Sequence, residues 1–316
     1  MSTGSIDAEE SVALLCIGAL SARRTTHATP ALGQLVVKSD NREIRRAALV
    51  ALGRIGISGA ESSVLAAIND QSGCIRREAA RIVADVKLGD ANHALWSRLD
   101  HEPYPDVVLE QVRAIIHLSH STTARLLENL LEHNRPEVRE AAITHWPDVS
   151  HASVKHILHE QMNDPDWRVR LRIVERLLED SDDTLFDMFV TAISDPHAYV
   201  RQAAVQALGR YSGTDVCVIL RGAVLKDSDL WVRSRAVEQL AKFRDGEAGP
   251  LFVQLLEKAP PPLQLTMARA LGELGEETAR EPLLRVQQHA IEEVQEAATW
   301  ALAQLQTSGP DCEAFA

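Results

Sequence analysis

The chain has 316 residues, a formal net charge of −12 and only 4% aromatic residues. The acidic balance argues against a general nucleic-acid-binding protein, because neutralising phosphates dominates such affinity. Sparse aromatics beside abundant alanine and leucine disfavour a β fold. Cys16, Cys74, Cys217 and Cys312 lie far apart, which predicts free thiols in a cytoplasmic protein. The apolar run at residues 12–20 is too short to span a bilayer, so we expect no membrane partner.

One phrase of sequence returns along the chain. In residues 195–209, Asp195-Pro196 starts a turn, and Val200 and Ala204 recur at helical spacing. We expect Gly209 to take the left-handed conformation that ends a helix. The apolar anchor of the phrase returns every 31 or 32 residues, at Val12, Ile44, Ile75, Val107, Val138, Val169, Val200, Val232, Leu263 and Val294. So regular a period predicts one array of stacked repeats in place of two ordinary domains.

Each repeat is predicted to hold two helices, A and B, joined by turns rich in Asp, Asn, Pro and Gly. We expect a flexible leader over residues 1–10, one solenoid over 11–306 and a disordered tail over 307–316. A helix over 11–22 caps the array, and a B helix follows each anchor, the first over 42–52. The A helices are predicted at residues 30–37, 62–68, 91–99, 122–132, 153–162, 183–193, 214–225, 248–257 and 277–288.

The phrase Asp-Pro-x-x-x-Val-Arg-x-Ala-Ala-x-x-Ala-Leu-Gly resembles HEAT-like repeats of the phycobilisome-lyase type, over residues 12–305. The resemblance implies an all-α fold: a right-handed α–α superhelix, or HEAT-like solenoid, of about nine two-helix repeats with an N-terminal capping helix. The B helices would line its concave side. Two repeats depart from the phrase, at Pro103-Tyr104-Pro105 and at Pro260-Pro261-Pro262, and we expect them to change the local curvature.

An arginine follows the anchor in six repeats. These residues are Arg45, Arg76, Arg139, Arg170, Arg201 and Arg233. They would form either a ladder for acidic ligands or a set of bridges to nearby carbonyls and to the turn aspartates Asp70, Asp164, Asp195 and Asp227. Recurrence in six repeats favours the bridges, because a planar guanidinium suits them. Val108 and Gln264 replace the arginine in the two departing repeats.

A second stripe of side chains lies two, six and ten residues after each anchor, on one face of helix B. In the first three repeats it is rich in arginine: Arg46, Arg54, Arg77, Arg81 and Arg113. In the next two it is acidic, with Glu140, Asp148, Glu175 and Glu179. We therefore predict a basic groove surface that binds an acidic segment of a partner protein. The alternative is a solvated face of mixed charge.

Three aromatic residues lie at the starts of consecutive B helices: Trp167, Tyr199 and Trp231. Exposed aromatics on one rim are common anchors of interfaces, so they form a second predicted partner-binding surface. The alternative is that they cover the seams between repeats.

These patterns favour a non-catalytic interaction scaffold or adaptor, with enzyme activity disfavoured. No catalytic, cofactor-binding or metal-binding residue is predicted, no cofactor is expected, and nucleic acid is an unfavoured partner. The family resemblance implies a first alternative, a bilin-lyase-like protein that handles a cofactor.

A histidine-rich middle region suggests a second alternative, a metal site. His117 and His120, and His156 and His159, are pairs at helical spacing. The HEAT-like enzyme deoxyhypusine hydroxylase holds two irons with repeated His-Glu pairs at matching repeat positions. Here His101-Glu102 and His159-Glu160 fall at non-equivalent positions. A metal-dependent oxidoreductase of that type is therefore the less favoured alternative.

Overall fold

The computed structural model describes residues 8–119, 124–148, 152–178 and 182–307. Within these ranges it contains nineteen α-helices, five short 3-10 helices and no strand. The B helices of neighbouring repeats pack on one another within residues 8–157 and, separately, within residues 158–307. The predicted all-α class and α–α superhelix of two-helix repeats are confirmed.

The odd-numbered helices are the B helices. Their bounds are α1 Ala8–Ala22, α3 Arg42–Ile55, α5 Gly73–Val86, α7 Pro105–Leu118, α9 Pro136–His145, α11 Trp167–Leu177, α13 Ala198–Leu208, α15 Leu230–Phe243, α17 Pro261–Leu274 and α19 Glu292–Thr307. The even-numbered helices are the A helices: α2 Thr29–Lys38, α4 Glu61–Ala67, α6 Asn92–Leu99, α8 Ala124–Leu131, α10 Ala152–Glu160, α12 Phe186–Ala192, α14 Thr214–Lys226, α16 Ala248–Leu256 and α18 Arg280–His289. These bounds lie close to the predicted ones, and several predicted A helices begin or end as a 3-10 turn.

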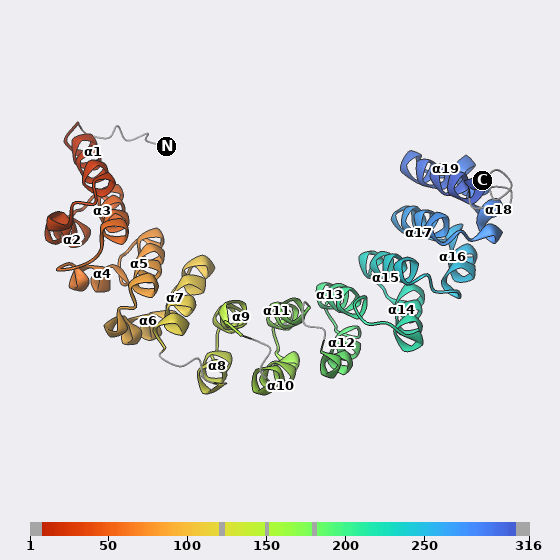
Figure 1. Ribbon diagram of the computed structural model, residues 1–316, viewed down its shortest axis with the longest axis horizontal. Coiled ribbons are helices and arrows are strands. Elements are labelled where there is room, and N and C mark those ends of the chain that lie inside the picture. Colours follow the sequence, from red (N-terminus) through yellow and green to blue (C-terminus); the bar gives the residue numbers. More distant parts are fainter. Residues whose placement is uncertain (1–7, 120–123, 149–151, 179–181, 308–316) are drawn as a thin grey trace, which may run out of the picture. The chain divides into compact units, whose positions relative to one another are not determined.

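The chain divides into two compact units, residues 1–157 and 158–316, and the division falls within α10. In the first unit the B helices α1, α3, α5, α7 and α9 form one layer and the A helices the other. The second unit repeats this arrangement with α11 to α19 (Figure 1). Each unit therefore exposes a face made of its B helices.

The core of each repeat is built from the anchors and the small residues that follow them. The alanines four residues after an anchor have no exposed surface: Ala48, Ala79, Ala142, Ala204 and Ala298. Nine of the ten anchors are buried, as the period predicts. The exception is Val12, which is 59% exposed, because α1 packs on α3 on one side and no described helix covers its other side.

Helix ends follow local hydrogen-bonding chemistry. The side-chain oxygen of Asn41 accepts hydrogen bonds from the N–H groups of Glu43 and Ile44 at the start of α3. The prediction for Gly209 was wrong: its φ is −63°, within the right-handed region. A Cβ at Gly209 would collide with the side chain of Gln239 on the next B helix, so close packing explains this glycine.

The two departing repeats keep the same fold. Pro105 and Pro261 each occupy the first position of a B helix, where the missing N–H is not needed. Their anchors, Val107 and Leu263, are buried like every other anchor except Val12. The expected change of curvature stays a prediction.

The predicted leader and tail concern the two ends of the chain. Helix α1 begins at Ala8, inside the range 1–10, and α19 ends at Thr307. Residues 1–7 and 308–316 lie outside the described residues. Among the described helices, none has the length and apolar character needed to cross a membrane.

Candidate interaction surface

The recurring arginine joins consecutive turns. Arg45 donates from Nε to the Asp70 carboxylate at 2.8 Å and from Nη1 to the carbonyls of Ser39 and Asp40. In each pair of this kind the carboxylate lies 25 or 26 residues after the arginine, in the turn before the next B helix. The same pairing joins Arg170 to Asp195 and Arg201 to Asp227, both at 2.7 Å. The bridging interpretation is confirmed for these arginines.

The turn carboxylates are fully engaged by this arrangement. Asp195 also accepts a hydrogen bond from the N–H of His197 at 2.8 Å. Burial acts to raise the pKa of Asp195, but the guanidinium of Arg170 and the His197 N–H outweigh it and hold the pKa below its ordinary value. We call these arginine–carboxylate pairs between consecutive turns the ladder, and each pair a rung. The ladder packs the repeats together, because its charges are paired with each other inside the protein.

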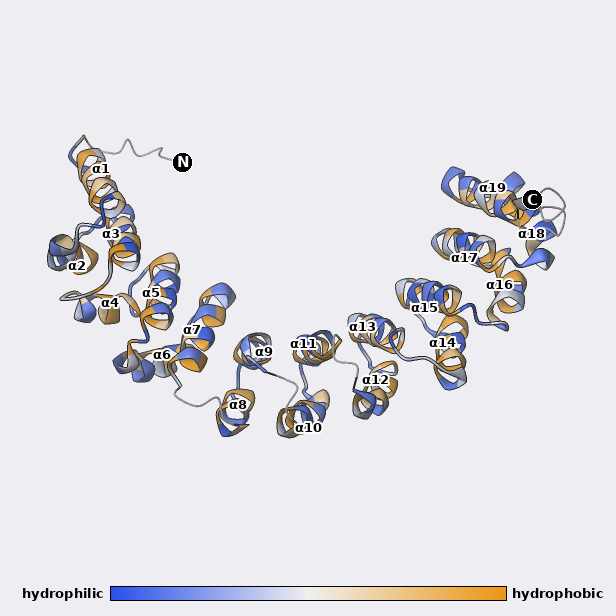
Figure 2. Cartoon of the chain, viewed as in Figure 1, coloured by the Kyte–Doolittle hydropathy of each residue, from blue (hydrophilic) through white to orange (hydrophobic). Residues whose placement is uncertain are grey.

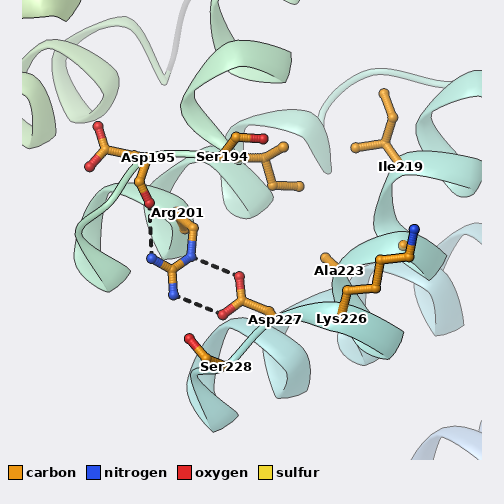
Figure 3. A pocket seen from close by; sticks show the side chains of 10 residues that line it. Ser194, Asp195, Arg201, Ile219, Ala223, Lys226, Asp227 and Ser228 are labelled. Atoms are coloured by element: carbon orange, nitrogen blue, oxygen red, sulfur yellow. Dashed lines mark hydrogen bonds and ion pairs between the residues drawn. The ribbon is translucent and has the colours of Figure 1, made fainter.

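A hollow of about 430 Å³ opens beside one rung of the ladder (Figure 3). Arg201 and Asp227 line it but bind each other, and Arg201 also donates to the Asp195 carbonyl. Ser194, Lys226 and Ser228 are its exposed polar residues. The hollow is a by-product of stacked turns, since its main charged groups already have partners.

Glu102 supplies the turn carboxylate that pairs with Arg76. Arg76 binds both its oxygens at 2.6 Å, Arg98 approaches at 3.3 Å, and the two paired side chains are 2% and 0% exposed. Burial acts to raise the pKa of Glu102, yet Arg76, the Tyr104 N–H and Arg98 together lower it. Sequence reasoning considered Glu102 only beside His101, although its distance of 26 residues from Arg76 matches the other rungs.

The predicted basic stripe lies on α3, α5 and α7, which are consecutive B helices. Its arginines are interleaved with carboxylates. Ion pairs join Arg46 to Glu43, Arg77 to Asp106, Arg81 to Glu78 and Asp85, and Arg113 to Asp85 and Glu110. Five arginines therefore share the stripe with five carboxylates, so it is a face of mixed charge at short range. Whether it binds a partner stays a prediction.

The acidic part of the stripe is described only in part. Glu140 is half-buried, while Asp148 and Glu175 are exposed. Glu175 forms an ion pair with Arg172 at 3.0 Å. Glu179 lies outside the described residues.

The three rim aromatics differ in their surroundings. Trp167 is half-buried and stacks on His197 of the next repeat, with ring centres 3.9 Å apart. Tyr199 lies beside this pair and is 55% exposed, and Trp231 is 69% exposed. Trp167 thus helps to cover a seam, whereas Tyr199 and Trp231 offer rings to solvent.

Sequence reasoning missed a further aromatic on the B-helix face of the second unit. Trp300 is 42% exposed and packs over Gly272 of α17, where a Cβ would lie 2.8 Å from the indole ring. It lines a hollow of about 360 Å³ with Arg269 and Glu273. The same two residues line a neighbouring hollow of about 280 Å³ between α15 and α17. Extending the stripe to the last repeat would have found Trp300, six residues after Val294.

A family model describing HEAT repeats matches residues 5–84, 29–116, 154–241 and 249–311. The chain belongs to the HEAT-repeat family. The matched family gives no support to the narrower phycobilisome-lyase type. A search of curated proteins finds no match.

Solved structures resemble this HEAT-repeat chain in fold. One shows Kap95p, whose binding induces the switch loops of RanGDP to adopt the GTP-bound conformation; it is 12% identical with a TM-score of 0.70. A Kap95:Nup1 complex is 12% identical with a TM-score of 0.66. Both alignments cover 98% of this chain and 50% of the other, so this chain spans half the length of Kap95.

Human deoxyhypusine hydroxylase in complex with glycerol is 20% identical. The alignment covers 92% of this chain and all of the enzyme, but the TM-score of 0.36 supports no argument. Across the described parts of the HEAT-repeat chain, no three His, Cys, Asp or Glu side chains gather as metal ligands would. His156 and His159 are exposed on α10, and His120 lies outside the described residues.

Proposed function

We propose that this HEAT-repeat protein is a non-catalytic scaffold or adaptor that binds a partner protein along its B-helix faces. The supporting observation is that its charged residues fall into two sets with different surroundings. The ladder arginines lie inside the turns and hold consecutive repeats together. Among the stripe arginines, Arg46, Arg54 and Arg77 are exposed and Arg81 and Arg113 are half-buried, so these side chains remain accessible to a partner.

On the first unit, the proposed ligand is an acidic segment of the partner. The side chains of Arg46 and Arg77 are more than half exposed, and that of Arg81 is 40% exposed. Exposed ion pairs are worth only about 0–1 kcal/mol, so a partner carboxylate can replace the present one at little cost. Because the stripe balances its own charges, its attraction should act at short range and weaken with salt.

On the second unit, exposed rings suit the same role. Tryptophan and tyrosine are enriched among residues that dominate binding energy at protein interfaces. Trp231 and Tyr199 stand at the rim, and Trp300 lies beside a hollow that can receive a partner side chain. These rings are therefore the second proposed contact.

Kap95, the protein named with Nup1 and RanGDP, gives this fold a precedent as a binder of proteins. We extend that role, without its partners, to the present chain. The proposal places the protein in the cytoplasm, in keeping with three free thiols at Cys16, Cys74 and Cys217. The likeness to phycobilisome-lyase repeats, with its bilin-handling alternative, stays a prediction.

Quantitative affinity capture from native cells tests this proposal. The wild type is compared with Arg77→Glu/Arg81→Glu and with a control of equal charge change, Lys226→Glu/Arg285→Glu, on A helices α14 and α18. We expect the stripe variant to lose its specific partner while its helical circular dichroism and melting temperature remain. The control should retain the partner. Equal capture by all three proteins would contradict the role of the stripe and leave the aromatic residues as the better candidate.

A further inference from the structure

Helix α1 differs from every other B helix in its surface. Of its fifteen residues only Ile17 and Ser21 are buried, while Val12 and Leu15 are 59% and 74% exposed. Figure 2 colours most of α1 as hydrophobic. Figure 1 shows it as the outermost member of the layer formed by α1, α3, α5 and α7. An apolar face of this length in contact with water favours association.

The exposed residues of α1 form one continuous seam. Glu9, Val12, Cys16, Ala19 and Arg23 are all exposed and follow one another at intervals of three, four, three and four residues. This spacing keeps side chains on one face of a helix and is the spacing of helix pairs that pack along their length. The contact with α3 uses the opposite face, which holds Ile17 and Ser21.

The charges at the ends of the seam are arranged for a partner of a particular kind. Glu9 lies at its start, Arg23 at its end and Cys16 midway between them. A second α1 placed antiparallel about a two-fold axis at Cys16 would set each Glu9 beside the other copy's Arg23. A parallel copy would set like charges together. Within the described residues neither Glu9 nor Arg23 has an ion-pair partner, so both are available for this contact.

We propose that two copies of this chain associate through α1, antiparallel, about a two-fold axis near Cys16. Such a contact is self-complementary, as two-fold interfaces must be. It would bury Val12 and Leu15, and the small side chains of Cys16 and Ala19 would let the helices approach closely. A 15-residue helix is about 22 Å long, so the interface is small and the dimer should be reversible. The inference does not depend on the proposed function.

Sedimentation equilibrium over a wide range of protein concentration tests the association. We expect the wild type to pass from monomer to dimer as concentration rises. Leu15→Glu should raise the dissociation constant by at least about tenfold, because it places a charge in the apolar seam. Leu15 is largely exposed, so the variant should fold normally by circular dichroism. Val218→Glu, at a 57% exposed site on α14, is the matched control and should dimerise like the wild type.

A charge exchange tests the antiparallel arrangement. Glu9→Arg and Arg23→Glu should each weaken the dimer by about threefold or more, since each brings like charges together at both ends of the seam. The double variant Glu9→Arg/Arg23→Glu should recover most of the affinity, because the pairs re-form with reversed signs. A double variant weaker than both single variants would overturn the antiparallel arrangement.

Cross-linking with a short bis-maleimide locates the axis. A thiol from each copy adds to one maleimide, so we expect a linked dimer in the wild type and its loss in Cys16→Ser. Two results would overturn the proposal: a monomer at every concentration, or a dimer indifferent to Leu15→Glu. A monomer whose Cys16 is also unreactive would mean that another part of the chain covers the seam.

Discussion

Two junctions between repeats solve the same packing problem with different chemistry. At the junction before α7, Arg76 and Glu102 form a bidentate ion pair that is almost fully buried. At the junction before α17, prolines replace the acidic turn, Arg233 donates to the Val224 carbonyl at 2.7 Å, and Gln264 donates to the Leu256 carbonyl at 3.1 Å. The helices stack in both places. The apolar packing between neighbouring B helices therefore suffices for stacking, and the ion pair is an addition to it.

The difference matters for what a mutation would cost. A buried ion pair is near neutral for stability when intact, but removing one partner strands the other charge in a medium that solvates it poorly. Removing a hydrogen bond between a partly exposed arginine and a carbonyl leaves no buried charge without a partner. The two junctions should therefore look alike in the wild type and respond very differently to substitution.

The largest expected effect is at the buried pair. Glu102→Ala should lower the free energy of unfolding by about 3–5 kcal/mol, because Arg76 would remain buried without its carboxylate. Urea denaturation measures this. Glu257→Ala is the control, since its exposed ion pair with Arg285 should contribute little. Similar losses for the two variants would break the comparison.

The same pair predicts a pH dependence. The pKa of Glu102 is lowered in the folded protein, so its stabilisation is present above the unfolded pKa of about 4.3 and is lost as pH falls through the folded value. Glu102→Gln should remove this contribution. Its unfolding free energy should then fall less steeply than that of the wild type below about pH 4. Parallel acid titrations of the two proteins would refute this assignment.

A matched pair of arginine variants sharpens the comparison. Arg201→Ala leaves Asp227 poorly solvated and unpaired and should destabilise by about 2–3 kcal/mol. Arg233→Ala removes a hydrogen bond to a carbonyl and should cost about 1 kcal/mol. Thermal unfolding followed by circular dichroism compares them. Equal melting temperatures would show that the ladder contributes no more than the simpler contact.

The apolar packing between neighbouring B helices can be tested separately. Ala204 has no exposed surface where α13 meets its neighbours, so Ala204→Leu should overpack this interface and cost about 1–3 kcal/mol. Ala203→Leu, at the adjacent half-buried position, is the control and should change stability much less. A melting temperature of Ala204→Leu equal to that of the wild type would show that Ala204 is not tightly packed between B helices.

The smallest expected effect is a difference in local unfolding between helices α17 and α13. Amides of α17 should exchange faster than those of α13, because the junction at Pro260 lacks the ion pairs that join the turns on either side of α13. Hydrogen exchange measured by mass spectrometry reports both helices at once. Equal protection would indicate that the apolar packing between neighbouring B helices alone sets local stability.

The fold and the ladder could be predicted because both follow from periodicity. An anchor every 31 or 32 residues locates the helices, and an arginine at a fixed distance from a turn aspartate predicts their pairing. The misses involve contacts that one repeat does not specify. Gly209 is explained by Gln239 on the next B helix, and Val12 is exposed although it occupies an anchor position.

The predicted stripe shows a similar limit. Its arginines were identified from their phase alone, and phase does not reveal where their side chains point. Arg77 reaches Asp106 on the next B helix, and Arg113 reaches back to Asp85. Both contacts depend on the register between neighbouring helices, so only the structure shows that the stripe balances its own charges. Trp300 was within reach of the sequence, because it has the same phase.

The central claim is that ladder residues pack the repeats and stripe residues bind the partner. The most direct test is the affinity of a captured partner for Arg77→Glu/Arg81→Glu and for Arg201→Ala, at a temperature where both variants are folded. We expect the stripe variant to lose affinity at an unchanged melting temperature. We expect the ladder variant to keep its affinity at a lowered melting temperature. The opposite pattern would show that the ladder residues bind the partner and the stripe residues pack the repeats.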